Sequence, residues 1–194
     1  MFYRISRLLF RFYFSILRRW EVSGRENMPE KGGVVIVSNH SSNLDPLIVG
    51  CSFKRYVNTM GKEELFKINP LVTWVIKHLG TFPIKRGQMD RSAIRFSINH
   101  LKAGNIIALF PEGTRSKSGE LQDARNGAAM LAIKAGVPIL PIGIIGSKGR
   151  GKIVVKIGKP IDTYLFSGDK VNKEAMGKVS EQFMKEIAKL LNND

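Results

Sequence analysis

Apolar residues along the chain alternate between short β-branched runs and stripes at helical spacing. The run Val34–Val37, which follows the Gly32-Gly33 turn, predicts a buried strand. Further strands are expected at Tyr56–Met60, Phe82–Ile84, Ile106–Phe110, Ile139–Ile145 and Ile153–Ile157. Helices are expected at Pro46–Phe53, Pro70–Leu79, Arg91–Lys102, Asn126–Ala135 and Lys173–Leu191. The alternation predicts a single α/β domain with a mixed central sheet flanked by helices.

The first twenty residues have a different pattern, with five Arg, no acid and seven aromatic side chains. Wound as a helix at about 100° per residue, four arginines fall within roughly 60° of one another: Arg4, Arg7, Arg11 and Arg18. Most of the remaining surface is apolar, which is typical of a helix lying in a lipid headgroup layer. We expect Arg4, Arg7 and Arg11 to reach phosphates there, with Phe12 and Trp20 at the interface.

Two other interpretations of this segment stay open. It could be a terminal helix docked on the protein's own core with its arginine face in water. It could also be an Arg-rich targeting presequence, although it is too aromatic and too poor in Ser for one. No stretch approaches the about 20 apolar residues needed to span a bilayer, and the arginines interrupt any signal-peptide core. Membrane attachment is therefore expected to be peripheral, on the cytoplasmic face.

Composition adds a strong charge bias, since 31 Lys+Arg against 16 Asp+Glu give a formal net charge of +15. Such an excess favours an anionic partner, whether nucleic acid, a membrane surface or a phosphorylated substrate. A second basic segment, Gly146–Pro160, contains five cations and no acid, and is either a solvated face or a contact for an anionic carrier or lipid. The single cysteine, Cys51, excludes a disulfide scaffold and a cysteine-built zinc site. No metal site is expected.

The first candidate chemistry lies in residues 39–46, Asn-His-Ser-Ser-Asn-Leu-Asp-Pro, directly after the strand Val34–Val37. Polar residues at a strand's carboxyl end are where α/β folds place their sites. Pro46 suits the first position of a helix, so Asp45 is expected to cap that helix while the loop turns back toward His40. A carboxylate on one imidazole nitrogen makes the other a base for a hydroxyl proton. The spacing also fits a plain helix cap beside an exposed histidine.

Three further segments carry weaker signals of their own. Residues 110–116, Phe-Pro-Glu-Gly-Thr-Arg-Ser, end a second buried strand and offer N–H groups, a hydroxyl and a guanidinium to a phosphate monoester, with Glu112 free to bind a polyol or to orient Arg115. Residues 80–86 end a strand with adjacent cations. Residues 137–141 are apolar and stiffened by two prolines, as the wall of an apolar-substrate pocket would be. Plain structural roles are the alternative for each.

Taken in order, these segments resemble the motifs of the glycerolipid acyltransferase family, which includes the 1-acyl-glycerol-3-phosphate (lysophosphatidic acid) acyltransferases. The motif N-H-x-x-x-x-D stands at Asn39, His40 and Asp45, and F-P-E-G-T-R-S matches residues 110–116 throughout. G-x-x-F-I-x-R stands at residues 80–86 with Pro83 in place of Phe, and V-P-I-x-P matches residues 137–141. The chain departs from the family at residues 124–127, where Ala-Arg-Asn-Gly replaces F-K-K-G.

The resemblance implies transfer of a fatty acyl group from acyl-CoA or acyl carrier protein to lysophosphatidic acid, giving phosphatidic acid, with no cofactor. His40 would take the hydroxyl proton and Asp45 would orient it. The implied substrate-binding residues are Lys62, Arg86, Glu112, Gly113, Thr114 and Arg115. The implied acyl-pocket residues are Val137, Pro138, Ile139 and Pro141. Residues 1–20 would form a membrane-interface helix and residues 21–194 the catalytic domain.

Rival functions remain. Acylation of glycerol-3-phosphate or another lysophospholipid is the nearest alternative. A basic nucleic-acid-binding protein would fit the charge, but the sequence holds no basic-aromatic recognition motif, so nucleic acid is not an expected partner.

Overall fold

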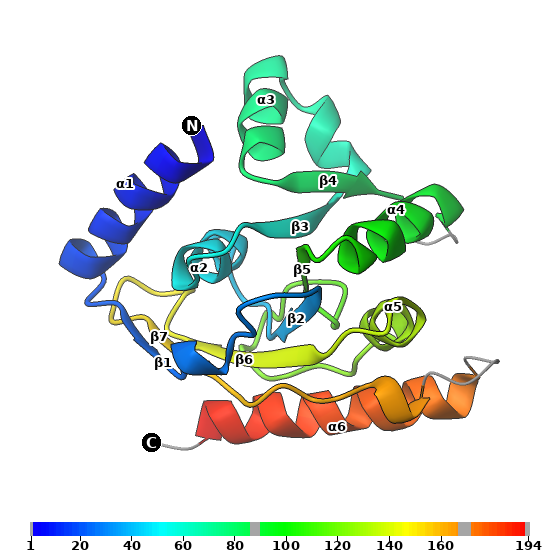
Figure 1. Cartoon of the computed structure of the whole chain (residues 1–194). Helices are drawn as coiled ribbons and strands as arrows, with labels where there is room; N and C mark the ends of the chain where they lie inside the picture. Colours follow the sequence, from blue (N-terminus) through cyan, green and yellow to red (C-terminus); the bar gives the residue numbers. More distant parts are fainter. Residues whose placement is uncertain (1, 86–89, 167–171, 193–194) are drawn as a thin grey trace.

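A computed structural model describes residues 2–85, 90–166 and 172–192 of the chain (Figure 1). The strands are β1 (Glu21–Ser23), β2 (Val34–Ser38), β3 (Val57–Lys62), β4 (Thr81–Ile84), β5 (Ile106–Leu109), β6 (Ile139–Ile145) and β7 (Val154–Ile157). The α-helices are α1 (Phe2–Leu17), α2 (Asp45–Ser52), α3 (Pro70–His78), α4 (Arg91–Lys102), α5 (Gly127–Ala135) and α6 (Lys173–Asn192). Three short 3₁₀ helices are η1 (Arg25–Asn27), η2 (Glu63–Lys67) and η3 (Tyr164–Phe166). The predicted helices and strands are confirmed to within a few residues.

The strands form one seven-stranded sheet in the order β1-β7-β6-β2-β5-β3-β4. Every neighbouring pair is parallel except β6 and β7, which are antiparallel, so the predicted mixed sheet is confirmed. The antiparallel pair follows from the short connection between these strands, whereas the parallel pairs need helical crossovers. Because β2, β3, β4, β5 and β6 run the same way, their carboxyl ends share one edge of the sheet.

Strand β2 lies near the middle of the sheet, and all four of its apolar residues, Val34–Val37, are fully buried. Helices cover both sides of it, which is why the sequence shows an uninterrupted apolar run rather than alternation. One core packs between the sheet and α1 and α2, and the other between the sheet and α4, α5 and α6 (Figure 1). Helix α3 lies beyond the β4 edge, against η2.

Strand β1 was not predicted from the sequence. It has three residues, pairs only with β7 at the sheet's edge, and contains a single apolar side chain, Val22. An edge strand this short needs no apolar run, because the backbone bonds to its neighbour define it. Its pairing with β7 carries the chain from the end of α1 into the sheet.

Candidate active site

His40 and Asp45 meet at the carboxyl end of β2. His40 Nδ1 lies 2.8 Å from Asp45 Oδ2, and the carboxylate is fully buried. The carboxylate facing Nδ1 assigns the ring proton to that nitrogen, which leaves Nε2 as the basic one. Nε2 makes no hydrogen bond to any residue within the described ranges. The pair therefore has the arrangement of a general base with its orienting carboxylate.

Asp45 does not cap α2, and that part of the prediction is wrong. It is the first residue of the helix, and its Oδ2 turns back to accept the backbone N–H groups of Ser41 and Ser42 at 2.8 and 2.7 Å. Asp45 Oδ2 thus accepts three hydrogen bonds from the loop, from the His40 imidazole and from the two backbone N–H groups. The predicted return of the loop toward His40 is confirmed, and these two backbone bonds fix its shape.

Residues 111–116 form a loop that hydrogen-bonds to the backbone of His40. Glu112 Oε1 accepts the His40 N–H at 2.8 Å, and the Ser116 N–H donates to the His40 carbonyl at 2.7 Å. The Phe110 ring stacks on the His40 imidazole with a centroid separation of 4.1 Å. Burial raises the pKa of Glu112, and the hydrogen bond from the His40 N–H opposes that rise. Glu112 thus positions the base. The residue is only 5% exposed, so it is not available to bind a polyol, contrary to the expectation from the sequence.

Arg115 is exposed beside this pair and is held by the loop rather than by Glu112. Its Nη1 donates to Asn43 Oδ1 at 2.8 Å, so the expected Glu112–Arg115 pairing is wrong. Asn43 is the site residue that sequence reasoning missed, although it stands inside the first motif. Lys62 is exposed at the carboxyl end of β3, two strands from β2 along the same edge. Arg86 lies outside the described residues.

Gly113 and Thr114 complete the loop. Gly113 has φ +74°, a backbone conformation that favours glycine, and a Cβ there would lie 2.9 Å from Arg125 Nε and displace that side chain. Thr114 is exposed and its hydroxyl lies 3.4 Å from Gln122 Oε1. The backbone N–H of Arg125 in turn donates to the Pro111 carbonyl at 2.9 Å. Arg125, the one cation at residues 124–127, therefore lies against the turn of the 110–116 motif.

The predicted acyl-pocket residues lie in the core instead of at the site. Ile139 pairs with Val35 and Pro141 with Val37, which places them along the body of β6 rather than at its carboxyl end. Val137 and Ile139 are buried in the core shared by α4, α5 and α6, and Pro138 precedes the strand. The reason is that β6 is parallel to β2, so its first residues lie at the edge opposite His40. This placement opposes a pocket-lining role.

Two of the three arginines of α1, Arg7 and Arg11, face the protein, so the orientation predicted for them is reversed. Arg7 and Arg11 donate to the carbonyls of Cys51, Phe53 and Lys54 at 2.7 to 3.2 Å, at and just beyond the end of α2. Orphan carbonyls at a helix C-terminus carry partial negative charge and attract cations. Neither the lipid-facing arginine stripe nor the alternative with arginines in water describes these two side chains.

The other residues of this segment divide between core and solvent. Arg18 is buried and donates to the carbonyls of Gly146, Gly149 and Gly151. Trp20 packs beside Phe14 in the core, with Arg25 over its ring, rather than at an interface. Arg4 and Phe12 are exposed as expected. Alongside Phe12, α1 exposes Ile5, Leu8, Leu9, Tyr13, Ile16 and Leu17.

The second basic segment surrounds the β6–β7 connection. Lys148 Nζ donates to the Lys117 carbonyl, and Lys152 pairs with Glu21 at 2.8 Å. Lys148 also lines a cavity of about 540 Å³ that Asn39 and Ser41 border next to His40. Across the described ranges, no group of three or more His, Cys, Asp or Glu is placed to hold a metal ion. Cys51 is buried, and burial raises its thiol pKa to about 11, so it is no nucleophile near neutral pH.

Fold and site together define an α/β protein with a histidine–carboxylate base at the carboxyl edge of its sheet. Comparison with known proteins refines this class. A family model described as Acyltransferase matches residues 19–145. The chain is 31% identical over 179 residues to the 1-acyl-sn-glycerol-3-phosphate acyltransferase of Bacillus subtilis, covering 89% of this chain and 88% of that one. The chain therefore belongs to the acyltransferase family.

Two further relatives agree in sequence and structure. The chloroplastic 1-acyl-sn-glycerol-3-phosphate acyltransferase BAT2 of Brassica napus is 35% identical over 83% of this chain. The chain spans about half the length of that plant protein. The crystal structure of the 1-acyl-sn-glycerophosphate (LPA) acyltransferase PlsC from Thermotoga maritima is similar with a TM-score of 0.73 at 30% identity, over 96% of this chain and 79% of that one.

Proposed function

We propose that this protein transfers a fatty acyl group from a thioester to the free hydroxyl of 1-acyl-sn-glycerol-3-phosphate, giving phosphatidic acid. The observation that carries the proposal is the buried Asp45 carboxylate 2.8 Å from His40 Nδ1, with Nε2 left available. The names of the relatives support the choice of acceptor. The donor is acyl-CoA or acyl carrier protein, and the reaction needs no further cofactor.

The proposed mechanism is direct transfer. His40 Nε2 takes the proton of the acceptor hydroxyl as its oxygen attacks the thioester carbonyl. The buried Asp45 carboxylate stabilises the imidazolium that forms. When the tetrahedral intermediate collapses, the C–S bond breaks and the imidazolium returns the proton to the departing thiolate. Arg115, exposed beside the pair, and Arg86 bind the acceptor phosphate, with Lys62 as a helper.

The decisive experiment is His40→Ala in a purified acceptor-by-donor assay. The variant should lose acyl transfer while its melting temperature stays near that of the parent, because His40 is not part of either apolar core. The panel contains lysophosphatidic acid, glycerol-3-phosphate and a neutral lysophospholipid, each with acyl-CoA and acyl carrier protein. Substantial turnover by folded His40→Ala protein would refute the mechanism, and a preference for glycerol-3-phosphate would refute the acceptor.

We also propose peripheral attachment to a phospholipid membrane through the exposed apolar face of α1, on the cytoplasmic side. Leu8, Leu9 and Phe12 are each about two-thirds exposed, at 69%, 64% and 67%. None of the helices in the described ranges is long and apolar enough to cross a bilayer. The double variant Leu9→Ser/Phe12→Ser tests the attachment, because it leaves the Arg7 and Arg11 contacts intact. Unchanged binding to anionic vesicles would disprove attachment through α1.

A further inference from the structure

Exposed apolar side chains form a second group on η2 and α3. Five of them, which we call the η2–α3 surface, are between 40% and 69% exposed: Leu65, Ile68, Leu71, Val72 and Trp74. None of the nine residues of α3 is buried, although the helix is mostly apolar. A helix of a soluble domain ordinarily buries its apolar stripe, and a contiguous exposed one marks an interaction surface.

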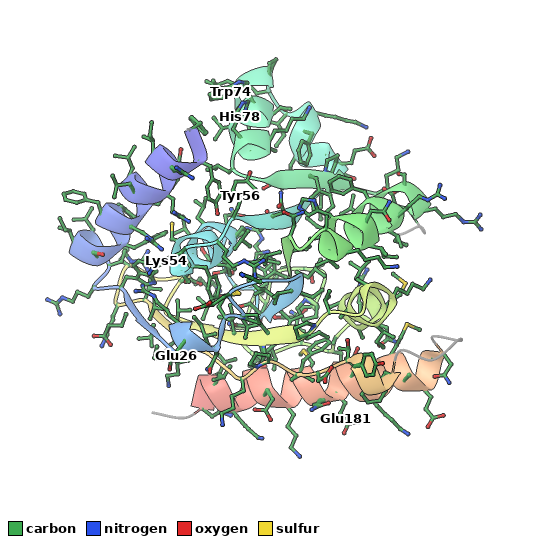
Figure 2. The ribbon with its side chains drawn as sticks, viewed as in Figure 1. Glu26, Lys54, Tyr56, Trp74, His78 and Glu181 are labelled. Carbon is green, nitrogen blue, oxygen red and sulfur yellow. The ribbon has the colours of Figure 1, made fainter. Side chains whose placement is uncertain are left out.

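This surface is continuous with the exposed face of α1. The Phe2 ring, at the start of α1, lies 4.8 Å from the Trp74 ring and 5.7 Å from the His78 ring, both edge-on. Figure 2 shows Trp74 and His78 on the side of α3 near the start of α1. Since the two helices meet through these rings, their exposed apolar side chains are neighbours on the surface.

Charge selects the kind of partner. Residues 62–85 contain four Lys and two acids and are therefore net positive, and Arg4 of α1 and Arg19 just after it are exposed. Of the two acids on η2, Glu63 pairs with Lys67 at 3.0 Å and Glu64 is exposed, whereas α3 contains Lys77 and no acid. Exposed apolar side chains in a net positive segment fit the boundary between headgroups and acyl chains of an anionic leaflet.

We propose that the η2–α3 surface is a second lipid-contacting element that inserts into the same leaflet as α1. The proposal rests on the proposed attachment of α1 and extends it. Two contacts at different places on the molecule fix its tilt, which one helix alone leaves free. Because η2 follows Lys62 at the end of β3, this tilt holds the carboxyl edge of the sheet, and with it His40, beside the headgroups from which a lysolipid enters.

The first test is vesicle flotation of the double variant Ile68→Ser/Leu71→Ser. Both side chains are about two-thirds exposed, so the fold should be unaffected. We expect roughly ten-fold weaker partitioning into vesicles containing phosphatidylglycerol, from the apolar area no longer inserted. The matched control is Tyr164→Ser, which removes a 76% exposed ring from η3, outside both groups. Partitioning equal to that of the control would overturn the proposal.

The second test places Trp74 directly. In Trp20→Phe protein Trp74 is the one remaining tryptophan. Its emission should shift to the blue on vesicle binding and be quenched by lipids brominated along the acyl chain. Vesicle-bound protein with unshifted, unquenched Trp74 would overturn the proposal. So would a blue shift without vesicles that grows with protein concentration, because it would assign the surface to a second copy of the chain.

These readouts separate the inference from the proposed chemistry. Folded His40→Ala protein should float and quench as its parent does. If acyl transfer by the parent is absent but Trp74 is quenched, the proposed reaction fails and the lipid contact stands. If transfer is present and Trp74 is not quenched, the reaction stands and the second contact fails.

Discussion

Replacing Asp45 by Asn isolates the charge of the buried carboxylate. The amide oxygen can still accept the Ser41 and Ser42 N–H groups and the imidazole N–H, so the loop keeps its three bonds. What disappears is the negative charge that faces His40 when it holds the substrate proton. The variant should therefore fold like the parent and be slow in the chemical step.

The size of the effect follows from the geometry. An Nδ1–Oδ2 distance of 2.8 Å puts the two charge centres about 4 Å apart, and at an effective dielectric constant of about 20 their attraction is about 4 kcal/mol. The carboxylate is fully buried, which limits screening by solvent. If the attraction acts only once His40 is protonated, kcat should fall roughly 1000-fold.

The assay is single-turnover acyl transfer with saturating lysophosphatidic acid, so that the chemical step is measured apart from binding. Asp45→Ala is the matched comparison, because it also leaves the loop N–H groups without their acceptor and should lower the melting temperature. A kcat for Asp45→Asn within ten-fold of the parent, in protein with an unchanged melting temperature, would refute the electrostatic role of the carboxylate.

Three further predictions test other parts of the molecule. Arg115→Ala should raise the KM for lysophosphatidic acid roughly 10- to 100-fold while kcat changes less, because a charged hydrogen bond to phosphate is lost; steady-state kinetics with an unaltered KM would remove Arg115 from the site. Arg18→Ala should lower the free energy of unfolding in urea by about 3 kcal/mol, since three carbonyls lose a buried charged donor; a loss under 1 kcal/mol would contradict this. The Cys51 thiol has a pKa near 9.0 unfolded and about 11 folded. The unfolded chain therefore binds fewer protons in that interval, and stability should fall from pH 9 to pH 11, a decline that Cys51→Ala should lack.

Local patterns were enough for most of the fold. Apolar and β-branched residues located six of the seven strands described, and the central strands β2 and β6 are continuously apolar because both of their faces are covered. The order of the motifs located His40, Asp45 and Arg115, because each follows a parallel strand and the carboxyl ends of such strands share one edge. Strand β1 and the Arg115–Asn43 bond left no such signal, as each depends on a partner far away in the sequence.

Tertiary structure decided the questions that periodicity leaves open. A helical stripe of arginines shows that a helix has two faces, but not which one is inward. In α1, Arg7 and Arg11 turn inward because α2, some 40 residues later, ends beside them with carbonyls that accept their hydrogen bonds. Strand register likewise places residues 137–141 away from His40. Because β6 pairs in parallel with β2, the carboxyl end of β6, and not its first residues, lies near His40. The sequence alone therefore determined the class of chemistry and the sheet that carries it. The direction in which α1 faces, and the exposed apolar surface this leaves, were decided by contacts between distant segments.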